Sequence, residues 1–535
     1  MHCQPATASA FQDNGRVVLV GFEDQDNLGT RYLSSYLRSF GHETRIVAIT
    51  RGPEPILETI RDFRPHIVGF SLIFQYFVEK YAALLKRLRK AGVEAHFTMG
   101  GHYASFEHGA LLEAIPELDS VVRFEGEETL LELTQSLSRG REWRQVAGIA
   151  FRRGREVITS EPRQGRRDLD ELPWPDRDDI GYEDRKIPLA SVLGGRGCPW
   201  KCSFCSIITF YDGNGTRGRR RRDPMRIVDE LEYLHRQRGV RVILWQDDDF
   251  LAGGRLAVRW AHDIASECVA RGLHHHLRWK FSCRSDEVKS ETLEPLVEAG
   301  LTHVYLGVEA GDEADLKDMN KLLKPDVHLR AGEVLRGLGL SFDFGFMLLQ
   351  PWSTIQSVRN NIQFLREFAG DGASAAGFCR MLPYVGTAVE ARLKAEGRLK
   401  RRDLQADYSF LEPRLDAFYQ WLLDTFEERN FTTSGTLNLL RMLLFHAHLD
   451  FPDRSARSGF RNAIHSITAM SNAITLDTVE AALDYFESAS PSGKEDPYPH
   501  LLTRHHSRQD GRIRLDIASL LVRHPEVLEH LHVSR

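Results

Sequence analysis

The sequence contains no apolar run of 18 or more residues, the length that a membrane-spanning helix requires. Residues 1–15 are polar and lack the apolar core of a secretory signal. Neither sign of charge dominates, since the chain has 70 Lys and Arg and 75 Asp and Glu, and the formal net charge is -5. We therefore expect a cytoplasmic protein with no membrane partner and no general affinity for nucleic acid.

Cysteine is also scarce, with seven residues in 535, so a disulfide framework is not expected. Three of the seven nevertheless lie within eight residues, at C-x3-C-x2-C spacing: Cys198, Cys202 and Cys205. Glycines before them allow the backbone to turn tightly. Three thiolates on one loop can hold three corners of an iron–sulfur cubane and leave one iron open to a ligand. A zinc site or a redox thiol site is the alternative.

The amino-terminal part alternates short apolar runs with helical patterns. Strands are expected at residues 16–21, 43–49, 66–71, 95–101 and 118–123, and helices at residues 27–40, 55–63, 77–91 and from residue 129. Repeated βα units predict an open parallel sheet with helices on both faces, a Rossmann-like (flavodoxin-like) domain. Such sheets bind ligands at the carboxyl ends of their strands, where this chain has glycine-rich and polar loops.

A second α/β unit is expected further along the chain. Six strands are predicted at residues 187–192, 240–245, 276–282, 303–309, 341–348 and 375–382, with five helices between them. They predict a partial (β/α)6 barrel of the TIM type, whose chemistry lies at the strand carboxyl ends.

The remaining segments connect or follow these two units. A β-hairpin and a charged linker precede the barrel, and a mostly α domain, with helices at residues 456–470 and 478–487 among others, is expected to cover its mouth. The predicted domains are residues 1–139, 140–186, 187–397 and 398–535.

Charged side chains follow several of the predicted barrel strands. Asp247 and Asp248 could accept hydrogen bonds from a ligand ammonium, or cap a helix. Arg284 could pair with a ligand carboxylate or form a surface salt bridge. Glu309 could bind hydroxyl groups or belong to a buried ion pair. Residues 217–222 contain five arginines, which we expect to anchor the loop or to bind an anionic substrate.

The cysteine motif, with Phe204 before its last cysteine, resembles the signature of the radical S-adenosylmethionine (SAM) superfamily. The resemblance implies that the three cysteines hold a [4Fe-4S] cluster and that SAM chelates its open iron. One electron from the reduced cluster would then release a 5′-deoxyadenosyl radical. It further implies an electron donor such as flavodoxin or ferredoxin. The SAM contacts implied are Phe204, Asp247, Asp248, Arg284 and Glu309.

The loops of the amino-terminal domain together resemble the cobalamin-binding domain that precedes many radical SAM domains. The cobalamin contacts implied are Asn27, Leu28, Ser71, Gln75, Gly100, Gly101, His102, Glu125, Gly126 and Glu127. The better-known cobalamin module carries Asp-x-His-x-x-Gly, whose histidine ligates cobalt. The stretch from Gln25 to Gly29 has no histidine, so cobalt would be held without one below it. His102 is expected to touch the corrin edge or solvent.

The combined resemblance covers residues 16–390 and implies a cobalamin-dependent radical SAM enzyme. The favoured reaction is methylation of an unactivated carbon of a metabolite or natural-product intermediate, on a small-molecule or peptide substrate. The alternatives are radical cyclisation or rearrangement, and a non-catalytic cobalamin or cluster sensor. Methylthio transfer to tRNA is not favoured because no second cysteine triad is present near the amino terminus. No catalytic residue is assigned.

Overall fold

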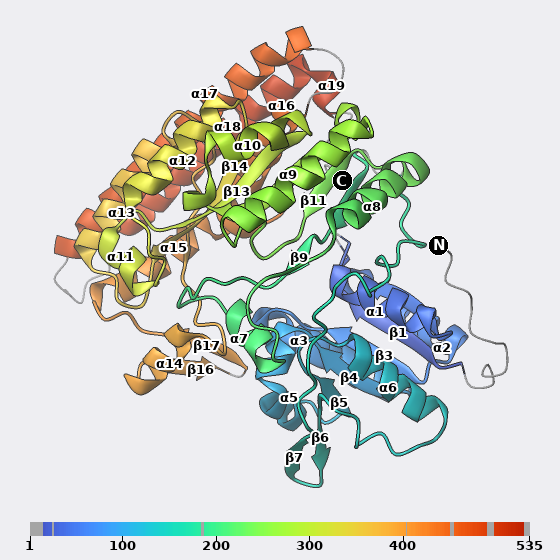
Figure 1. Ribbon diagram of the computed structural model, residues 1–535. Coiled ribbons are helices and arrows are strands. Elements are labelled where there is room, and N and C mark those ends of the chain that lie inside the picture. The colour runs from blue at the N-terminus through green and yellow to red at the C-terminus, as the bar shows by residue number, and fades with distance from the viewer. Residues whose placement is uncertain are drawn as a thin grey trace.

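The computed structural model describes residues 14–23, 26–182, 187–402, 404–449, 454–488 and 497–528. Gln25 of the loop discussed above and the end of the predicted linker, residues 183–186, lie outside the described residues. Figure 1 shows the amino-terminal domain (blue) below the barrel (green to yellow), with the segment that follows the cysteine loop between them. The carboxyl-terminal helices (orange to red) lie along the far side of the barrel.

The amino-terminal domain is built on a sheet of seven strands in the order β2-β1-β3-β4-β5-β6-β7. The first five are parallel, as predicted, because their apolar runs are buried between helices on both faces. Their bounds are β1 (Arg16–Gly21), β2 (Glu43–Ala48), β3 (Ile67–Ser71), β4 (His96–Gly100) and β5 (Ser120–Val122). The helices are α1 (Leu28–Ser39), α2 (Pro53–Phe63), α3 (Val78–Lys90), α4 (His102–Phe106), α5 (His108–Ala114) and α6 (Glu127–Ser138).

The hairpin that the sequence predicted in the linker extends this sheet. It consists of β6 (Ile149–Arg153) and β7 (Glu156–Thr159), and β6 pairs antiparallel with β5. The sheet is therefore mixed and not purely parallel, which corrects the prediction. The physical reason is that β5 would otherwise be an unpaired edge, and Ile149, Ala150 and Phe151 bury their side chains by covering it.

The six predicted strands of the second unit form one parallel sheet in the order β15-β14-β13-β12-β11-β8. They are β8 (Leu189–Val192), β11 (Val242–Trp245), β12 (Arg278–Arg284), β13 (Leu301–Glu309), β14 (Ser341–Leu349) and β15 (Cys379–Arg380). The covering helices are α8 (Pro224–Arg238), α9 (Arg255–Ala270), α10 (Ser290–Glu298), α12 (Pro325–Gly337) and α13 (Ile355–Ala369), with the short α11 (Glu313–Asp318). The cysteine loop is followed by α7 (Ile207–Gly213) and bracketed by the ribbon of β9 (Gly195–Arg196) and β10 (Arg220–Arg221).

The carboxyl-terminal part is mostly helical, as predicted, but its arrangement differs from the prediction. It contains α14 (Ala388–Ala395), β16 (Leu399–Arg402), β17 (Gln405–Tyr408), α15 (Arg414–Phe431), α16 (Thr436–His448), α17 (Arg454–Ser488), α18 (Tyr498–Arg523) and α19 (Pro525–Leu528). The helices predicted at 456–470 and 478–487 are one helix, α17, because no glycine or proline interrupts residues 471–477. Buried Asn472 instead bonds backbone groups of Ala369 and Ser374.

Helix α16 packs on the inner face of the half-barrel and does not cover its mouth. Along β13, Val304, Leu306 and Val308 are buried under the outer helices, so the alternate residues face inward. The ring of Phe445 on α16 lies 5.3 Å from that of inward-facing His303. His303 stands near the amino end of β13, and α16 therefore covers the end of the barrel away from the strand carboxyl ends.

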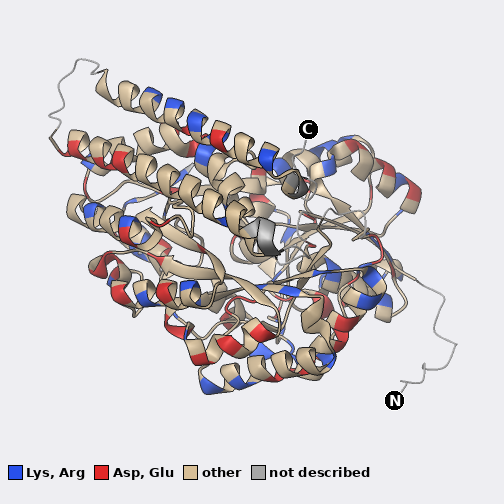
Figure 2. Ribbon diagram, turned by 90° about the horizontal axis from the view of Figure 1, so that it is seen from above, with Lys and Arg blue, Asp and Glu red and all other residues tan. Residues whose placement is uncertain are grey.

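Both signs of charge are interspersed over the outer helices, in keeping with the small net charge (Figure 2). No helix within the described ranges has both the length and the apolar character needed to cross a bilayer.

A buried ion triad ties the linker to the barrel. The carboxylate of Glu230 on α8 is fully buried and accepts from Arg177 at 2.9 Å and from Arg222 at 2.7 Å. Burial alone would raise the pKa of Glu230, but the two guanidinium groups outweigh it and hold that pKa below its usual value.

We predict that Glu230→Gln lowers the free energy of unfolding by about 3–5 kcal/mol, because it leaves two buried arginines without an anionic partner. Thermal or urea denaturation measures this loss. Asp326→Asn, which removes an exposed ion pair with Arg330, is the control and should leave the melting temperature unchanged. Equal stability of the two variants would contradict the role given to the triad.

Candidate functional site

A cavity of about 760 Å³ lies where the carboxyl ends of β1, β3, β4 and β5 face the barrel. Nine of the ten predicted cobalamin contacts line it: Asn27, Leu28, Ser71, Gly100, Gly101, His102, Glu125, Gly126 and Glu127. The tenth, Gln75, is buried in the turn before α3 and is not among the lining residues. The barrel side of the cavity consists of Leu193, Arg196, Phe210, Tyr211, Gln246 and Asp248. The cavity has the size of a site for a large organic ligand.

The loops around this cavity approach each other closely. Gly101 has a φ of 108°, and a Cβ there would lie 2.5 Å from the carbonyl oxygen of Leu72. Only glycine fits this position, which lets the loop after β4 lie directly against the loop after β3. The side chain of Asn27 caps α1 by accepting from the backbone N–H of Thr30.

Two of the predicted cobalamin contacts bind the barrel through their carboxylates. Glu125 accepts from Arg196 at 2.8 Å and from Arg220 at 2.8 Å, and Glu127 accepts from Arg196 at 2.6 Å. Burial raises the pKa of Glu125, but the arginines outweigh it and lower that pKa. These carboxylates line the cavity and at the same time hold the two domains together.

His102 is sequestered and not solvated, which rules out one of the two environments expected for it. Its ring stacks on Phe210 of α7 with 4.0 Å between ring centroids. Its Nε2 atom is buried and has no hydrogen-bond partner among the residues that the structure describes. Burial lowers the pKa of His102 to about 4, so the ring is neutral near pH 7. A buried nitrogen without a partner at a cavity wall fits a ligand that carries a hydrogen-bonding group.

The three cysteines of the motif are free thiols on a loop that hydrogen bonds hold in place. The N–H of Ser203 donates to the carbonyl of Met319 at 2.9 Å, and the Asn320 side chain donates to the carbonyl of Lys201 at 2.6 Å. Burial raises the pKa of Cys205 to about 12, so the thiolate form needs a bound cation to be stable.

The part of the chain that the structure describes contains no group of three His, Cys, Asp or Glu side chains placed around a single metal ion. A cubane distributes its cysteine ligands over separate iron atoms, so this donor set of three cysteines on one loop fits a cubane.

Cationic side chains lie next to the cysteine loop. The guanidinium of Arg284 stacks over Trp200 at 4.1 Å, lies 3.9 Å from the sulfur of Cys202 and donates to the carbonyl of Lys321 at 2.8 Å. Lys321 pairs with Glu309 at 3.1 Å, and Glu309 adopts a left-handed φ of 72°. The structure therefore brings Arg284 and Glu309 to one place. The sequence did not predict Lys321 as a site residue, because it follows a short helix and not one of the predicted strands.

The three consecutive aspartates after β11 have different environments. Asp247 accepts from the N–H of Gly194 at 2.9 Å and pairs with Arg219, so its carboxylate is occupied by the chain. Asp248 accepts from the N–H of Gly197 at 2.8 Å and lines the cavity, and burial raises its pKa to about 6. Phe204 is half-buried and packs against the barrel core.

Asp249 and Glu287, neither of which the sequence singled out, form a pair of carboxyl groups. Asp249 is 4% exposed, and within the described part of the chain its Oδ1 atom has no hydrogen-bond partner. Burial and the neighbouring Asp249 raise the pKa of Glu287 to about 9. Two carboxyl groups in this position share a proton unless a cation binds between them.

The arginine-rich segment anchors the loop, as predicted. Arg219 pairs with Asp247, Arg220 with Glu125, and Arg222 with Glu230. These partners lie on three different segments, so the ribbon after the cysteine loop is fixed to both domains.

Comparison with known proteins identifies both units. Residues 17–134 match the B12 binding domain, and residues 192–365 match the radical SAM superfamily. The chain is similar to a protein of Pyrococcus horikoshii named uncharacterized methyltransferase PH0819, with 28% identity over 366 residues that cover 67% of this chain and 76% of that protein. It is also similar to the anaerobic magnesium-protoporphyrin IX monomethyl ester cyclase of Cereibacter sphaeroides, with 32% identity over 280 residues, 50% of this chain and 44% of the cyclase.

A solved structure shares the fold across nearly the whole chain. The cobalamin-dependent S-adenosylmethionine radical enzyme OxsB superposes with a TM-score of 0.70 at 18% identity and covers 96% of this chain and 80% of that one. The cavity lies at the strand ends of the domain that matches the B12 binding domain, and the cysteine loop lies in the segment that matches the radical SAM superfamily. The chain belongs to the radical SAM enzymes that carry a B12-binding domain, and its cofactors are cobalamin, a [4Fe-4S] cluster and SAM.

Proposed function

We propose that this enzyme methylates an unactivated carbon of a small molecule or peptide. The observation that supports the proposal is a cavity lined both by the loops of the B12-binding domain and by Asp248 and Arg196 beside the cysteine loop. A methyl carrier bound there would lie next to the radical source, so that both could act on the same substrate atom. The similarity to a protein named as a methyltransferase supports the same reaction.

In this proposal Cys198, Cys202 and Cys205 hold the cluster. When bound, the cluster and SAM supply a carbon-centred radical, and cobalamin supplies the methyl group. Arg284 offers a cation for the SAM carboxylate, and its stacking on Trp200 fixes the guanidinium plane. Glu309 accepts from ribose hydroxyl groups, and its ion pair with Lys321 fixes the position of its side chain.

The ammonium group of SAM has a matching partner in the carboxyl pair. Asp249 and Glu287 lie near Arg284 and Lys321, whose charges act on Asp249. A cation bound between the two carboxyl groups replaces the shared proton and satisfies the unpartnered oxygen of Asp249. Asp247 then serves to position the loop and does not contact the ligand.

On the other side of the cavity, the backbone at Gly100 and Gly101 would allow the corrin to approach the sheet edge, and Nε2 of His102 would be available to bond a polar group of the cofactor. Radical cyclisation is the second candidate reaction, and the 32% identity to the cyclase favours it.

Replacing any one motif cysteine by alanine should abolish the cluster. Iron content and the absorbance of the anaerobically reconstituted protein measure this, because a cubane cannot keep three protein ligands when one thiolate is removed. Cys268→Ala is the control, since Cys268 is a buried thiol on α9 remote from the motif. A motif variant that retains the full iron content would contradict the assignment.

Glu287→Gln should change both the pH dependence of stability and SAM affinity. The folded protein holds this proton up to about pH 9, whereas the ordinary pKa is 4.5. The unfolded chain therefore binds fewer protons between these values, and the free energy of unfolding falls as pH rises through them. Glu287→Gln should remove this pH dependence of the free energy of unfolding in the ligand-free protein. Melting temperatures recorded between the two pKa values measure the effect.

The same substitution should weaken SAM binding about tenfold, because a hydrogen bond to a charged group contributes about 1.5–3 kcal/mol. Equilibrium dialysis measures the affinity, and Glu291→Gln, at an exposed position on α10, serves as the control. Unchanged affinity in Glu287→Gln would contradict the role of the carboxyl pair.

The products of SAM distinguish the reactions. We expect the anaerobically reconstituted protein, supplied with cobalamin, SAM and a strong reductant, to form both 5′-deoxyadenosine and S-adenosylhomocysteine, since methylation consumes SAM in two ways. Formation of 5′-deoxyadenosine alone would support cyclisation or rearrangement. Formation of neither product would support a sensor and contradict the proposal.

A further inference from the structure

Asp26 lies at the boundary between the two cofactor regions. It precedes Asn27 in the loop after β1, lines the cavity and is 2% exposed. Its φ of 55° is left-handed, a conformation that costs most non-glycine residues free energy but that aspartate tolerates. A buried, unfavourable backbone conformation persists only where the surrounding contacts impose it.

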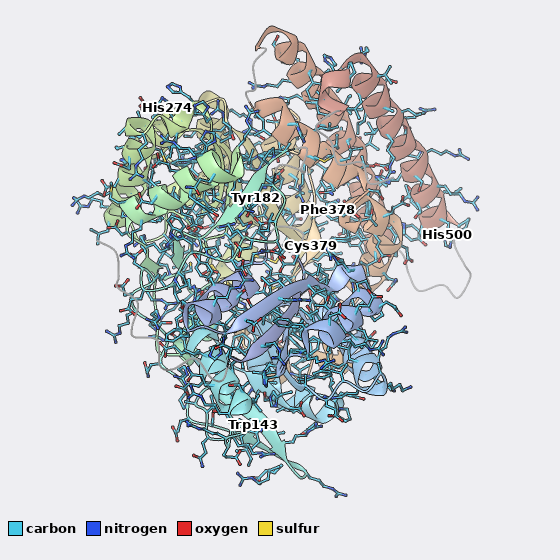
Figure 3. The ribbon with its side chains drawn as sticks, turned by 90° about the vertical axis from the view of Figure 1, so that its right-hand side faces the viewer. Trp143, Tyr182, His274, Phe378, Cys379 and His500 are labelled. Carbon is cyan, nitrogen blue, oxygen red and sulfur yellow. The ribbon has the colours of Figure 1, made fainter. Side chains whose placement is uncertain are left out.

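Two hydrogen bonds to Asp26 come from outside its own domain. Its Oδ2 atom accepts from the backbone N–H of Ser191 at 3.1 Å and from the hydroxyl of Tyr182 at 3.0 Å. Ser191 belongs to β8, the strand that leads directly into the cysteine loop. Tyr182 lies near the centre of the molecule (Figure 3). The carboxylate therefore joins the loop of the cobalamin site to the strand that carries the cluster site.

Arg177 makes this connection rigid. It donates to the carbonyl of Ser191 at 2.7 Å and to the hydroxyl of Tyr182 at 2.8 Å, and its Nη1 lies 3.6 Å from Asp26. Its Nη2 atom also pairs with the carboxylate of Glu230 at 2.9 Å. Burial raises the pKa of Tyr182 to about 12, so its hydroxyl keeps the proton that it donates.

The ion pairs of Arg196 differ in kind from this contact. Arg196 with Glu125 and Glu127 joins flexible side chains, whose ends tolerate small displacements. Asp26 is a short side chain bonded to a strand N–H, so a shift of the strand moves the loop with it.

We propose that Asp26 is a positioning residue that sets the separation of cobalamin from the cluster. This inference rests on the cofactor sites proposed above. A misplacement of about 1 Å at a reacting centre can reduce a rate by about a hundredfold, so a fixed separation matters to methyl transfer. Asp26 itself touches neither reacting atom in this account.

The test uses two substitutions at Asp26 and one control. Asp26→Gly permits the left-handed backbone without strain and removes the carboxylate, so it separates the contact from the conformation. Asp26→Asn keeps an oxygen that can accept from Ser191 and removes the charge that faces Arg177. Asp178→Asn is the control, because Asp178 is a linker aspartate whose side chain is 77% exposed.

The readout is the distance distribution between cob(II)alamin and the reduced cluster, measured by pulsed electron paramagnetic resonance on full-length reconstituted protein. We expect one narrow distribution in the wild type and in Asp178→Asn. Asp26→Gly should broaden or shift it while iron and cobalamin content stay at wild-type values, and Asp26→Asn should have a smaller effect. The ratio of 5′-deoxyadenosine formed to methyl groups transferred should rise about tenfold in Asp26→Gly. The reason is that the radical source is intact while the methyl donor no longer reaches the substrate carbon.

The proposal would be overturned if both Asp26 variants showed the wild-type distance distribution. It would also be overturned if both variants lost cobalamin, because Asp26 would then be a cobalamin-binding residue. If Asp26→Gly does not fold, Tyr182→Phe removes one donor without altering the loop and should still broaden the distribution. A wild-type protein that shows no cobalt or cluster signal would instead refute the cofactor sites, and this outcome is distinct from failure of the positioning role.

Discussion

Buried ion pairs between arginines and carboxylates hold the two domains together, and the rest of the site depends on them. Arg196 and Arg220, which bracket the cysteine loop, both reach Glu125 at the end of β5. Removing one member of such a pair leaves an uncompensated buried charge, which is strongly destabilising. The cavity exists because this junction closes around it and leaves the loops after β1, β3 and β4 facing the barrel.

The site has unsatisfied groups that match the cofactors of the family. The three thiols have raised pKa values through burial. Among the described residues, a buried nitrogen of His102 and a buried oxygen of Asp249 have no hydrogen-bond partner. Native structures seldom leave buried polar atoms unpaired, so each such atom beside the cavity or the cysteine loop is a candidate for a bond to a bound ligand.

The sequence predicted the strands and most helices because each carries a strong local signal. The apolar runs of β1 and β13 could not be placed anywhere but in a core, and Asn27 marks the start of α1 by its capping side chain. The cysteine motif was recognisable since its three ligands lie on one loop, so spacing alone revealed it.

Features that depend on contacts distant in the sequence could not be predicted. Asp249 and Glu287 are separated by the whole of α9 and β12, and nothing near either residue indicates that the two carboxyl groups meet. The partners of Glu125 lie far along the chain, so its ion pairs were not visible in its own loop. The pairing of β6 with β5 likewise depends on an edge that only the folded sheet creates.

Mössbauer spectroscopy of protein reconstituted with isotopically enriched iron, with and without SAM, tests the central claim most directly. The account predicts a [4Fe-4S] cluster in which one iron differs from the other irons and changes its spectrum when SAM is added. A cluster whose irons are all unaffected by SAM, or the absence of a cubane in oxygen-free preparations, would contradict it.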